Sequence, residues 1–246
     1  MDFLILRFDA PLMSFGGPIV DNRGAIQDHP PLSLLTGLIG NALGYDHREP
    51  ERLQALQRRI RYCCRRDRTG ERMTDFQTVD LGQDFLVDKG WTTRGAIERR
   101  AGGSAREGTH IRTRDYLADA VFTIALTLDP ADETPTLGEV AAALDSPERP
   151  LFLGRKPCLP AAPLLLERIE AASLLEALAL ASRLAPDRVD GDPNVRPAWW
   201  PDGEGPADVG TALPVTDERD WKNQIHGGQR LVRHGKVELK EVEHAG

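Results

Sequence analysis

The segment REGTHIRTRDY, residues 106–116, gathers side chains that are suited to contacts with nucleic acid. In an extended chain, successive side chains point to opposite faces, so every second residue shares a face. Guanidinium groups bind phosphates, whereas imidazole and phenol groups contact bases or 2′-hydroxyl groups. The row that would share one face consists of His110, Arg112, Arg114 and Tyr116, with Arg106 earlier on the same segment.

The same row contains the groups that metal-independent RNA cleavage requires. One group would take the proton of the 2′-hydroxyl, a second would protonate the leaving 5′-oxygen, and a cation would stabilise the phosphorane. A solvated edge strand explains the pattern equally well. The segment alone therefore leaves RNA contact and a solvated strand as open interpretations.

A second basic motif is LGRKPC, residues 153–158, which follows an apolar run. Its glycine would let the backbone approach a neighbour closely, and its proline would stiffen the chain that follows. Arg155 and Lys156 are then either phosphate contacts or part of a solvated turn.

The charge distribution is uneven, although the net charge of −7 argues mildly against a nucleic-acid partner. Residues 52–72 contain eight arginines against two acids, and residues 89–116 contain seven basic residues against three acids. Residues 129–148 contain six acids and no lysine or arginine. Because the local field steers a polyanion, the two basic segments keep RNA binding open.

Several classes of site have no support in the sequence. The six histidines are scattered and form no metal-binding spacing, and phosphate-binding glycine loops and a Gly-x-Ser-x-Gly elbow are absent. We therefore expect no metal, no cofactor and no paired-carboxylate catalysis. No apolar run approaches the ~20 residues of a membrane span, and the three cysteines favour a reducing cytoplasm.

The elements that position these motifs can be predicted in outline. Residues 3–8 are predicted as a buried strand, and residues 9–31, rich in glycine and proline, as a long functional loop. An apolar stripe over 35–43 predicts a helix capped by Ser33 and stopped at Gly44. Gly37 and Gly40 inside it each cost about 1 kcal/mol, which predicts a strand or ligand very close to the helix.

The rest of the chain shows further element signals. They predict a helix from Pro50, a hairpin turning at residues 67–72, a strand over 118–128, capping boxes at Thr136 and Ser173, a linker over about 186–210, and a last hairpin turning near His234 and Gly235.

Without its insertions the order is β-α-β-β-α-β, which is typical of a ferredoxin-like α+β fold. We expect residues 1–185 to form this domain, with a basic insertion over about 80–114. Residues 186–246 are expected to form a linker and a C-terminal β-hairpin extension.

Four ordered blocks resemble a known family. LILRFDAPLMSFGGP, PPLSLLTGLIGNALGYD, THIRTRDYLADAVFTIAL and FLGRKPCLPAAPL are similar to the CasD family of type I-E Cascade, the CRISPR surveillance complex. The match runs from residue 1 to about 170, and residues 186–246 resemble the family only loosely.

The resemblance implies a RAMP-type, ferredoxin-like, cytoplasmic protein that caps the 5′ handle of the CRISPR RNA in antiviral DNA interference. It implies a protruding hairpin thumb, here at about 80–114, which wedges against the RNA and the adjacent CasC backbone subunit. The large CasA subunit would dock nearby, and target DNA would be met only through the complex. Because a separate subunit, CasE, cuts the precursor RNA in such systems, the resemblance implies a binder without catalytic residues.

With the resemblance, Arg155 and Lys156 are interpreted as phosphate or sugar contacts, and the glycines as places where the RNA backbone lies close. The acidic stretches would face away from the RNA. The residues predicted to bind RNA are Gly16, Gly17, Arg23, Gly37, His110, Arg112, Arg114, Tyr116, Arg155 and Lys156, and those predicted for the thumb are Arg94, Arg99, Arg100 and Arg106.

Two alternatives stay open. A homologous subunit in type I-C systems cleaves the precursor RNA, and Tyr45, His29, His110 and Tyr116 could serve as such a set here, although the row over 109–116 lacks a lysine. The other alternative is a scaffold that contacts CasC and CasA without binding RNA.

Overall fold

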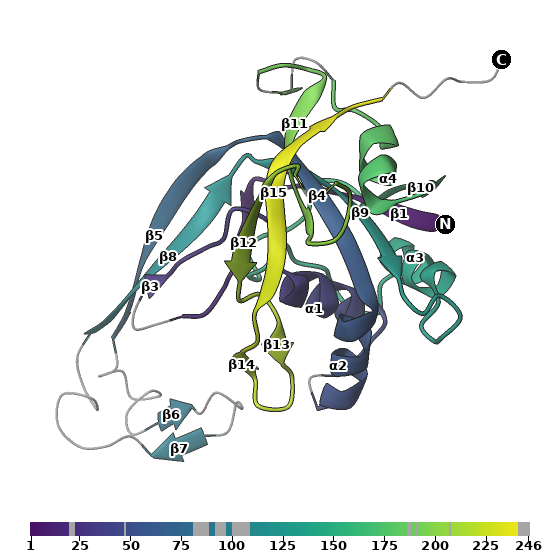
Figure 1. The fold of residues 1–246 in the computed structure, drawn as a ribbon. Helices are drawn as coiled ribbons and strands as arrows, with labels where there is room; N and C mark the ends of the chain where they lie inside the picture. Colours follow the sequence, from purple (N-terminus) through teal and green to yellow (C-terminus); the bar gives the residue numbers. More distant parts are fainter. Residues whose placement is uncertain are drawn as a thin grey trace.

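A seven-stranded antiparallel sheet with the order β10-β1-β9-β4-β11-β15-β12 forms the body of the protein (Figure 1). The computed structural model describes residues 1–19, 23–46, 48–80, 89–91, 97–99, 109–185, 188–189, 191–206 and 208–240; for 80, 89–91, 97–99, 109 and 110 it describes the backbone. The strands of the sheet are β1 (Asp2–Asp9), β4 (Ile60–Arg68), β9 (Val121–Leu128), β10 (Leu165–Glu170), β11 (Val195–Pro201), β12 (Thr211–Val215) and β15 (Arg230–Glu238).

Two long strands, β5 (Glu71–Asp80) and β8 (Thr109–Ala118), form an arm that projects from this sheet (Figure 1). They pair antiparallel over their full ten residues, and we call them the β5–β8 arm. The short strand β2 (Leu12–Met13) pairs with the end of β8 next to the body, and β3 (Arg23–Gly24) pairs with β8 at Thr113 and Arg114. Two small ladders complete the strands: β6 (Lys89–Trp91) with β7 (Ile97–Arg99), and β13 (Arg219–Asp220) with β14 (Ile225–His226).

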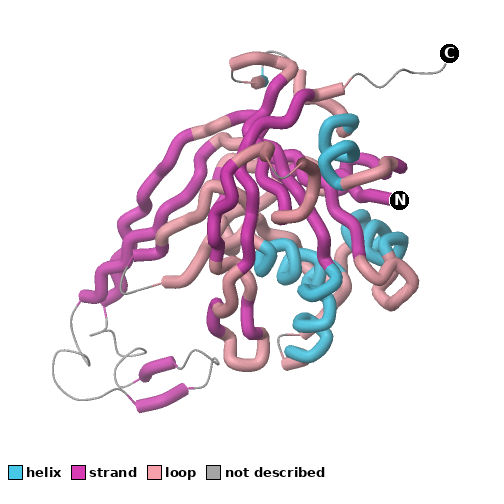
Figure 2. Tube along the Cα trace, viewed as in Figure 1, coloured by secondary structure: helices cyan, strands magenta, loops and turns pink. Residues whose placement is uncertain are grey.

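Helices pack on both faces of the main sheet (Figure 2). The helices α1 (Leu32–Ala42), α2 (Pro50–Arg59) and α3 (Leu137–Asp145) contribute to one hydrophobic cluster, and α4 (Leu174–Leu180) contributes to a second. The alternation of a strand explains the division, because Leu4 and Leu6 of β1 belong to the first cluster and Phe3 and Ile5 to the second.

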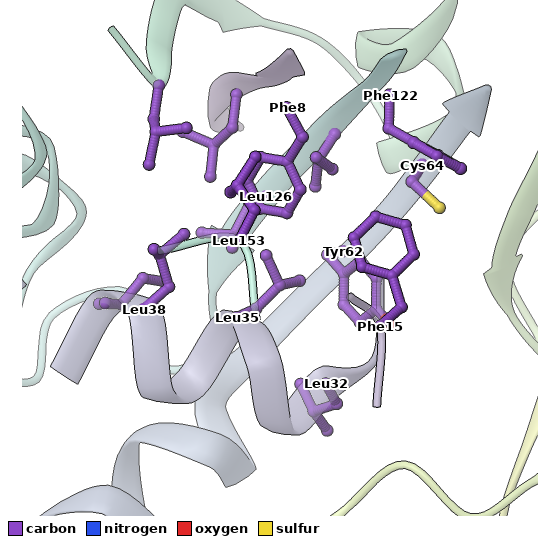
Figure 3. Close-up of a cluster of buried hydrophobic side chains, with 14 of the residues drawn as sticks. Phe8, Phe15, Leu32, Leu35, Leu38, Tyr62, Cys64, Phe122, Leu126 and Leu153 are labelled. Carbon is purple, nitrogen blue, oxygen red and sulfur yellow. The ribbon is translucent and has the colours of Figure 1, made fainter. Parts of the chain in front are cut away.

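The helix α1 presents its predicted apolar stripe to the sheet. Leu35 and Leu38 point toward Phe8 and Leu126 (Figure 3), and Leu32 belongs to the same hydrophobic cluster. Leu35 is fully buried, and Leu38 keeps only 4% of its surface exposed. This packing holds α1 against the sheet and leaves its other side available to line a site.

The predicted α+β class and the β-α-β-β-α-β order are confirmed. Strands β10, β1, β9 and β4 are neighbours in that order, α1 and α2 connect β1 to β4, and α3 lies between β9 and β10. The strand predicted over 118–128 is β9, and Pro50 begins α2 as expected.

Two predicted hairpins are wrong. Strand β4 pairs with β9 and β11, whereas β5 pairs with β8, because Gly70 at φ +64° redirects the chain into the arm. Strand β15 runs without a turn through His234 and Gly235, since the absent side chain of Gly235 makes room for the Trp200 ring. A Cβ there would lie 2.6 Å from the ring.

The segment after residue 185 adds to the main sheet. Strand β11 lies between β4 and β15, where a linker had been predicted. Proline is rare in central strands because it cannot donate a hydrogen bond to the ladder. Pro197 and Pro201 therefore made this segment resemble a linker in the sequence. Strand β4 pairs with β11 only at Ala198 and Trp199, so Pro197 lies outside that pairing.

The N-terminus of α1 is capped from far along the chain. Ser33 lies inside the helix, and Pro31 at the cap position makes no side-chain hydrogen bond. Instead, the amide of Leu32 donates to Asp217 Oδ2 at 3.0 Å, and the amide of Ser33 donates to the Asp217 carbonyl at 2.9 Å. By contrast, the capping box predicted at Thr136 forms locally with Glu139.

Asp217 is fully buried, and Arg230 neutralises it through two hydrogen bonds of 2.7 and 2.6 Å. Arg230 also donates to the Tyr62 hydroxyl at 2.7 Å. Burial acts to raise the pKa of Asp217, but the hydrogen bonds and charge of Arg230 outweigh it, and the net pKa is lowered. Asp217 thus joins α1, β4 and β15 as a buried carboxylate.

We expect Asp217→Asn to lower the free energy of unfolding by about 3 kcal/mol at neutral pH, because it leaves Arg230 without its charge partner. A carboxyl with a lowered folded pKa stabilises the protein above its unfolded pKa of about 3.9, and this contribution disappears as the pH falls through the folded pKa. Urea denaturation should therefore show the largest gap between variant and parent above about pH 5, closing in acid. Asp132→Asn, at an exposed position, is the control, and a pH-independent gap would contradict the assignment.

Candidate functional site

A groove of about 450 Å³ lies between α1, the loop after β2, the turn 152–156 and the β13–β14 hairpin. Of the described residues that line it, three are cationic and none is acidic. Five residues predicted from sequence to bind RNA meet here, from three separate segments: Gly16, Gly17, Gly37, Arg155 and Lys156.

The glycine of the LGRKPC turn serves the packing of the protein itself. Gly154 has φ +106°, a conformation that favours glycine, and a Cβ there would overlap the Ser14 carbonyl oxygen. The Ser14 amide donates to the Leu153 carbonyl at 2.9 Å, which fixes the turn against the loop after β2. The close approach predicted for this glycine is therefore to Ser14.

Arg155 connects the groove to the β5–β8 arm. Its guanidinium donates to the Asp115 carbonyl at 3.0 Å and the Gly24 carbonyl at 3.2 Å, and it lies 4.9 Å over the Tyr116 ring. Lys156 is exposed and has no ion pair with a described residue. The two adjacent cations thus differ. Arg155 is half-buried and holds the turn against β3 and β8, whereas Lys156 is exposed and accessible to a ligand.

Gly24 allows two arginines to converge on the base of the arm. A Cβ at this position would lie 2.5 Å from Arg155 Nη2 and 2.9 Å from Arg114 Cδ. Gly24 also pairs directly with Arg114 in the parallel β3–β8 register. Gly24 was not predicted as a site residue, and its role depends on contacts between three distant segments.

The predicted row on β8 is only partly available. Arg112 and Arg114 are half-buried, and the side chain of His110 lies outside the described residues. Tyr116 retains 3% exposure beneath Arg155, so its ring has no face to offer a base. The prediction that Tyr116 contacts RNA is corrected for this reason. Strand β8, which carries this row, belongs to a second sheet and not to the seven-stranded one.

Asp115 occupies the opposite face of β8 and anchors another predicted residue. It accepts hydrogen bonds from Arg23 Nη2 at 3.1 Å and from Thr74 Oγ1 at 2.8 Å. Burial acts to raise the pKa of Asp115, but these hydrogen bonds outweigh it, and the net pKa is lowered. The Arg23 side chain stays 70% exposed, so Asp115 orients a guanidinium that still faces solvent.

The β13–β14 hairpin supplies a wall that the sequence did not predict. It contributes Arg219, Trp221 and His226, and Trp221 comes within 3.5 Å of where a Cβ on Gly37 would lie. Arg219 donates to the Gln224 carbonyl at 3.0 Å, and Trp221 Nε1 donates to Gln57 Oε1 at 3.0 Å. The only local sequence signal for this wall is Trp221, an aromatic residue close to the cations Arg219 and Lys222.

Three buried polar atoms that line the groove have no hydrogen-bond partner among the described residues: Ser14 Oγ, Arg219 Nε and His226 Nδ1. Buried polar groups are normally paired, so unpaired ones at a groove suit a polar ligand. Burial, reinforced by the charge of Arg219, lowers the pKa of His226, which keeps its imidazole neutral near pH 7.

The arginine-rich segment 52–72 has largely structural roles. Six of its eight arginines form ion pairs with described acids, so acids of the protein itself balance most of the positive charge of this segment. These arginines are Arg52, Arg59, Arg61, Arg65, Arg68 and Arg72. Arg65 is fully buried and donates to the carbonyls that end α4.

The alternative catalytic set is not assembled. His29 is 5% exposed and stacks on Trp199, and burial lowers its pKa to about 4. Tyr45 follows the C-terminal end of α1, whereas His29 precedes its N-terminal end. The two ends of this eleven-residue helix are roughly 16 Å apart. Tyr116 is buried on β8.

The predicted thumb residues Arg94, Arg100 and Arg106 lie outside the described residues, as does the side chain of Arg99 in β7. Within the described part of the chain, no group of three or more His, Cys, Asp or Glu residues is arranged to hold a metal ion. The same part contains no helix with the length and apolar character needed to cross a membrane.

Comparison with known proteins gives this site a context. The family model described as "CRISPR-associated protein (Cas_Cas5)" matches residues 3–233. The chain belongs to the Cas5 family of CRISPR-associated proteins. It is 32% identical over 178 residues to the CRISPR system Cascade subunit CasD of Escherichia coli (strain K12), covering 72% of this chain and 75% of that protein.

Solved structures of Cas proteins share the fold. A chain of a structure titled "CRISPR RNA-guided surveillance complex" matches with a TM-score of 0.65 and 26% identity, over 96% of this chain and 90% of that one. A second, titled "Crystal structure of Cas protein", matches with a TM-score of 0.60 and 24% identity, over 96% and 95% of the two chains. The family match extends through β11 and β12 into β15, so it includes the β13–β14 wall of the groove.

We expect Gly24→Ala to lower the free energy of unfolding by about 1–2 kcal/mol, because the new methyl group displaces Arg155 from its two carbonyl acceptors. Gly16→Ala is the matched control, since a Cβ at Gly16 meets nothing within 4 Å. Urea denaturation measures both. Equal stability of the two variants would show that Arg155 does not hold the arm.

Proposed function

We propose that this Cas5-family protein is an RNA-binding subunit of a CRISPR surveillance complex and holds the 5′ handle of the CRISPR RNA in the cationic groove. The observation that carries the proposal is the convergence of Arg155, Lys156 and Arg219 on one groove with no acid among its described lining residues. The relationship to CasD supports the choice of CRISPR RNA as ligand.

The groove and the arm make a continuous path for a polyanion. Arg155 reaches from the groove to Gly24, where Arg114 converges, and Arg23 extends the exposed positive charge along β3. The unpaired polar atoms of Ser14, Arg219 and His226 provide hydrogen-bonding groups for a base or a 2′-hydroxyl. Phosphate contacts along the path would set position, and these polar groups would add selectivity.

Within a complex, the arm is the part we assign to neighbouring proteins. Phe76 is 62% exposed and Ile111 is 47% exposed, and the β5–β8 register places both on one face of the arm. In keeping with the thumb of the CasD family, we propose that this face packs against a CasC backbone subunit. CasA would dock nearby, target DNA would be met only through the complex, and the protein would act in the cytoplasm.

The proposed activity is binding without cleavage. The groove offers the cations of a phosphate site, but His29 is buried with a pKa of about 4, and Tyr116 is buried under Arg155. These two therefore cannot reach a 2′-hydroxyl in the groove, and Tyr45 lies beyond the far end of α1. The protein would hold the product of a separate RNA-cutting subunit.

We expect Lys156→Ala to weaken binding of handle RNA and of a scrambled RNA similarly, since a phosphate contact carries little sequence information. The log–log dependence of affinity on salt should become shallower by about 0.7, the value for one single-strand phosphate. Fluorescence anisotropy of labelled RNA across a salt series measures both. Lys236→Ala removes the same charge from an exposed position of β15 and should leave the slope unchanged. An unchanged slope for Lys156→Ala would assign this lysine to a solvated turn.

We expect purified protein to leave a labelled repeat RNA intact in the presence of EDTA, because the described candidate groups His29, Tyr45 and Tyr116 are not brought together. Denaturing gel electrophoresis of the RNA over time provides the measurement. His110→Ala serves as the decisive variant: specific cleavage by the parent that this substitution abolishes would make the protein an endoribonuclease.

A further inference from the structure

A second cleft, of about 820 Å³, lies at the end of the main sheet where β1 begins and β9 ends. We call it the distal cleft. It is enclosed by the first turns of α3 and α4 and by the turn over residues 201–204. Strand β1 runs from the distal cleft toward the arm. Its eight residues make the strand roughly 23 Å long.

The floor of the distal cleft is apolar. Phe3 and Leu128 are almost fully buried, Leu174 is 5% exposed, and Leu137 is half-buried at the start of α3. These side chains come from four different elements. Leu128 belongs to the first hydrophobic cluster, against which Leu137 packs, and Phe3 and Leu174 belong to the second, so both clusters contribute to the lining of the cleft. An aliphatic side chain placed there would gain free energy by leaving water.

The rim of the cleft is acidic, in contrast to the groove. It contains Asp2, Asp129, Asp202 and Glu204, against a single cationic side chain, Arg61. Two of the four acids are occupied: Asp202 pairs with Arg233 at 2.6 Å, and Glu204 accepts the Leu174 amide at 3.0 Å.

The other two acids are the more accessible ones. The Asp2 carboxylate has no partner among the described residues, and Asp129, 70% exposed, meets Arg61 only at 4.0 Å. Their charge disfavours the phosphates of RNA, and the described residues contain no metal-binding group. One unpaired and one exposed, weakly paired carboxylate beside an apolar lining complement a cationic side chain next to an aliphatic one.

We propose that the distal cleft docks an extended segment of another protein, which places an aliphatic side chain on the floor and an adjacent arginine or lysine between Asp2 and Asp129. This surface is separate from the proposed RNA groove and does not depend on it. It would let the protein bind RNA at one end of its sheet and a basic protein segment at the other.

The test uses the full-length protein and two fluorescein-labelled peptides, Gly-Leu-Arg-Leu-Gly and its charge-reversed form Gly-Leu-Glu-Leu-Gly. Fluorescence anisotropy should show that the arginine peptide binds at least tenfold more tightly than the glutamate peptide. The double variant Asp2→Asn with Asp129→Asn should remove most of this preference. Asp132→Asn, which removes one charge from an exposed residue outside the cleft lining, should retain it.

Gly138→Trp tests the cleft by filling it. Gly138 is exposed in the first turn of α3, and a Cβ there meets only Thr136 Oγ1, at 3.9 Å, so the fold should tolerate the substitution. The variant should lose arginine-peptide binding while its thermal unfolding and its affinity for handle RNA stay unchanged. Undetectable binding of the arginine peptide to the parent, equal binding of the two peptides, or unchanged binding by Gly138→Trp would overturn the proposal. Handle-RNA affinity, measured in parallel, tests the proposed function independently.

Discussion

The buried carboxylate of Asp217 sets the geometry on which the groove depends. It caps α1, which forms one wall, and it lies two residues before Arg219, where the hairpin of the opposite wall begins. Arg230 balances its charge and connects it to Tyr62 on β4. A buried charge is tolerated only when it is paired and hydrogen-bonded, so these contacts must form together. The two walls are therefore positioned by one interaction.

Arg155 plays the corresponding part at the other side of the groove. It joins the LGRKPC turn to β3 and β8, and Gly24 provides the space for its guanidinium. Arg155, which the sequence predicts as a phosphate contact, thus also holds three segments together. Its neighbour Lys156 is the more exposed of the two cations. Many arginines behave in the same way, because six of the eight in 52–72 are paired with acids. The charge presented to a partner differs from the charge counted along the chain.

A net charge of −7 is compatible with the proposed polyanionic ligand because the charges of the protein are separated in space. Cations face the groove and the arm, whereas the exposed acids Asp2 and Asp129 lie in the distal cleft, where β1 begins and β9 ends. Because screening in physiological salt acts over about 8 Å, acids at the start of β1 do little to the field at the other end of this strand, roughly 23 Å away. Each end can then favour a partner of opposite charge.

Local patterns in the sequence determined the elements whose signals lie within a few residues: the apolar stripe of α1, the capping box at Thr136, the strand β9 and the β-α-β-β-α-β order. Five of the residues predicted to bind RNA also lie together in the groove: Gly16, Gly17, Gly37, Arg155 and Lys156. Tertiary structure decided the rest. Strand β11 is a strand because β4 and β15 pair with it despite its prolines, and Asp217 caps a helix 185 residues away. Trp221 lines the groove and Tyr116 is buried, and in both cases distant segments that pack around the side chain decide its environment. The periodicity of residues along the chain does not specify which distant segments these are.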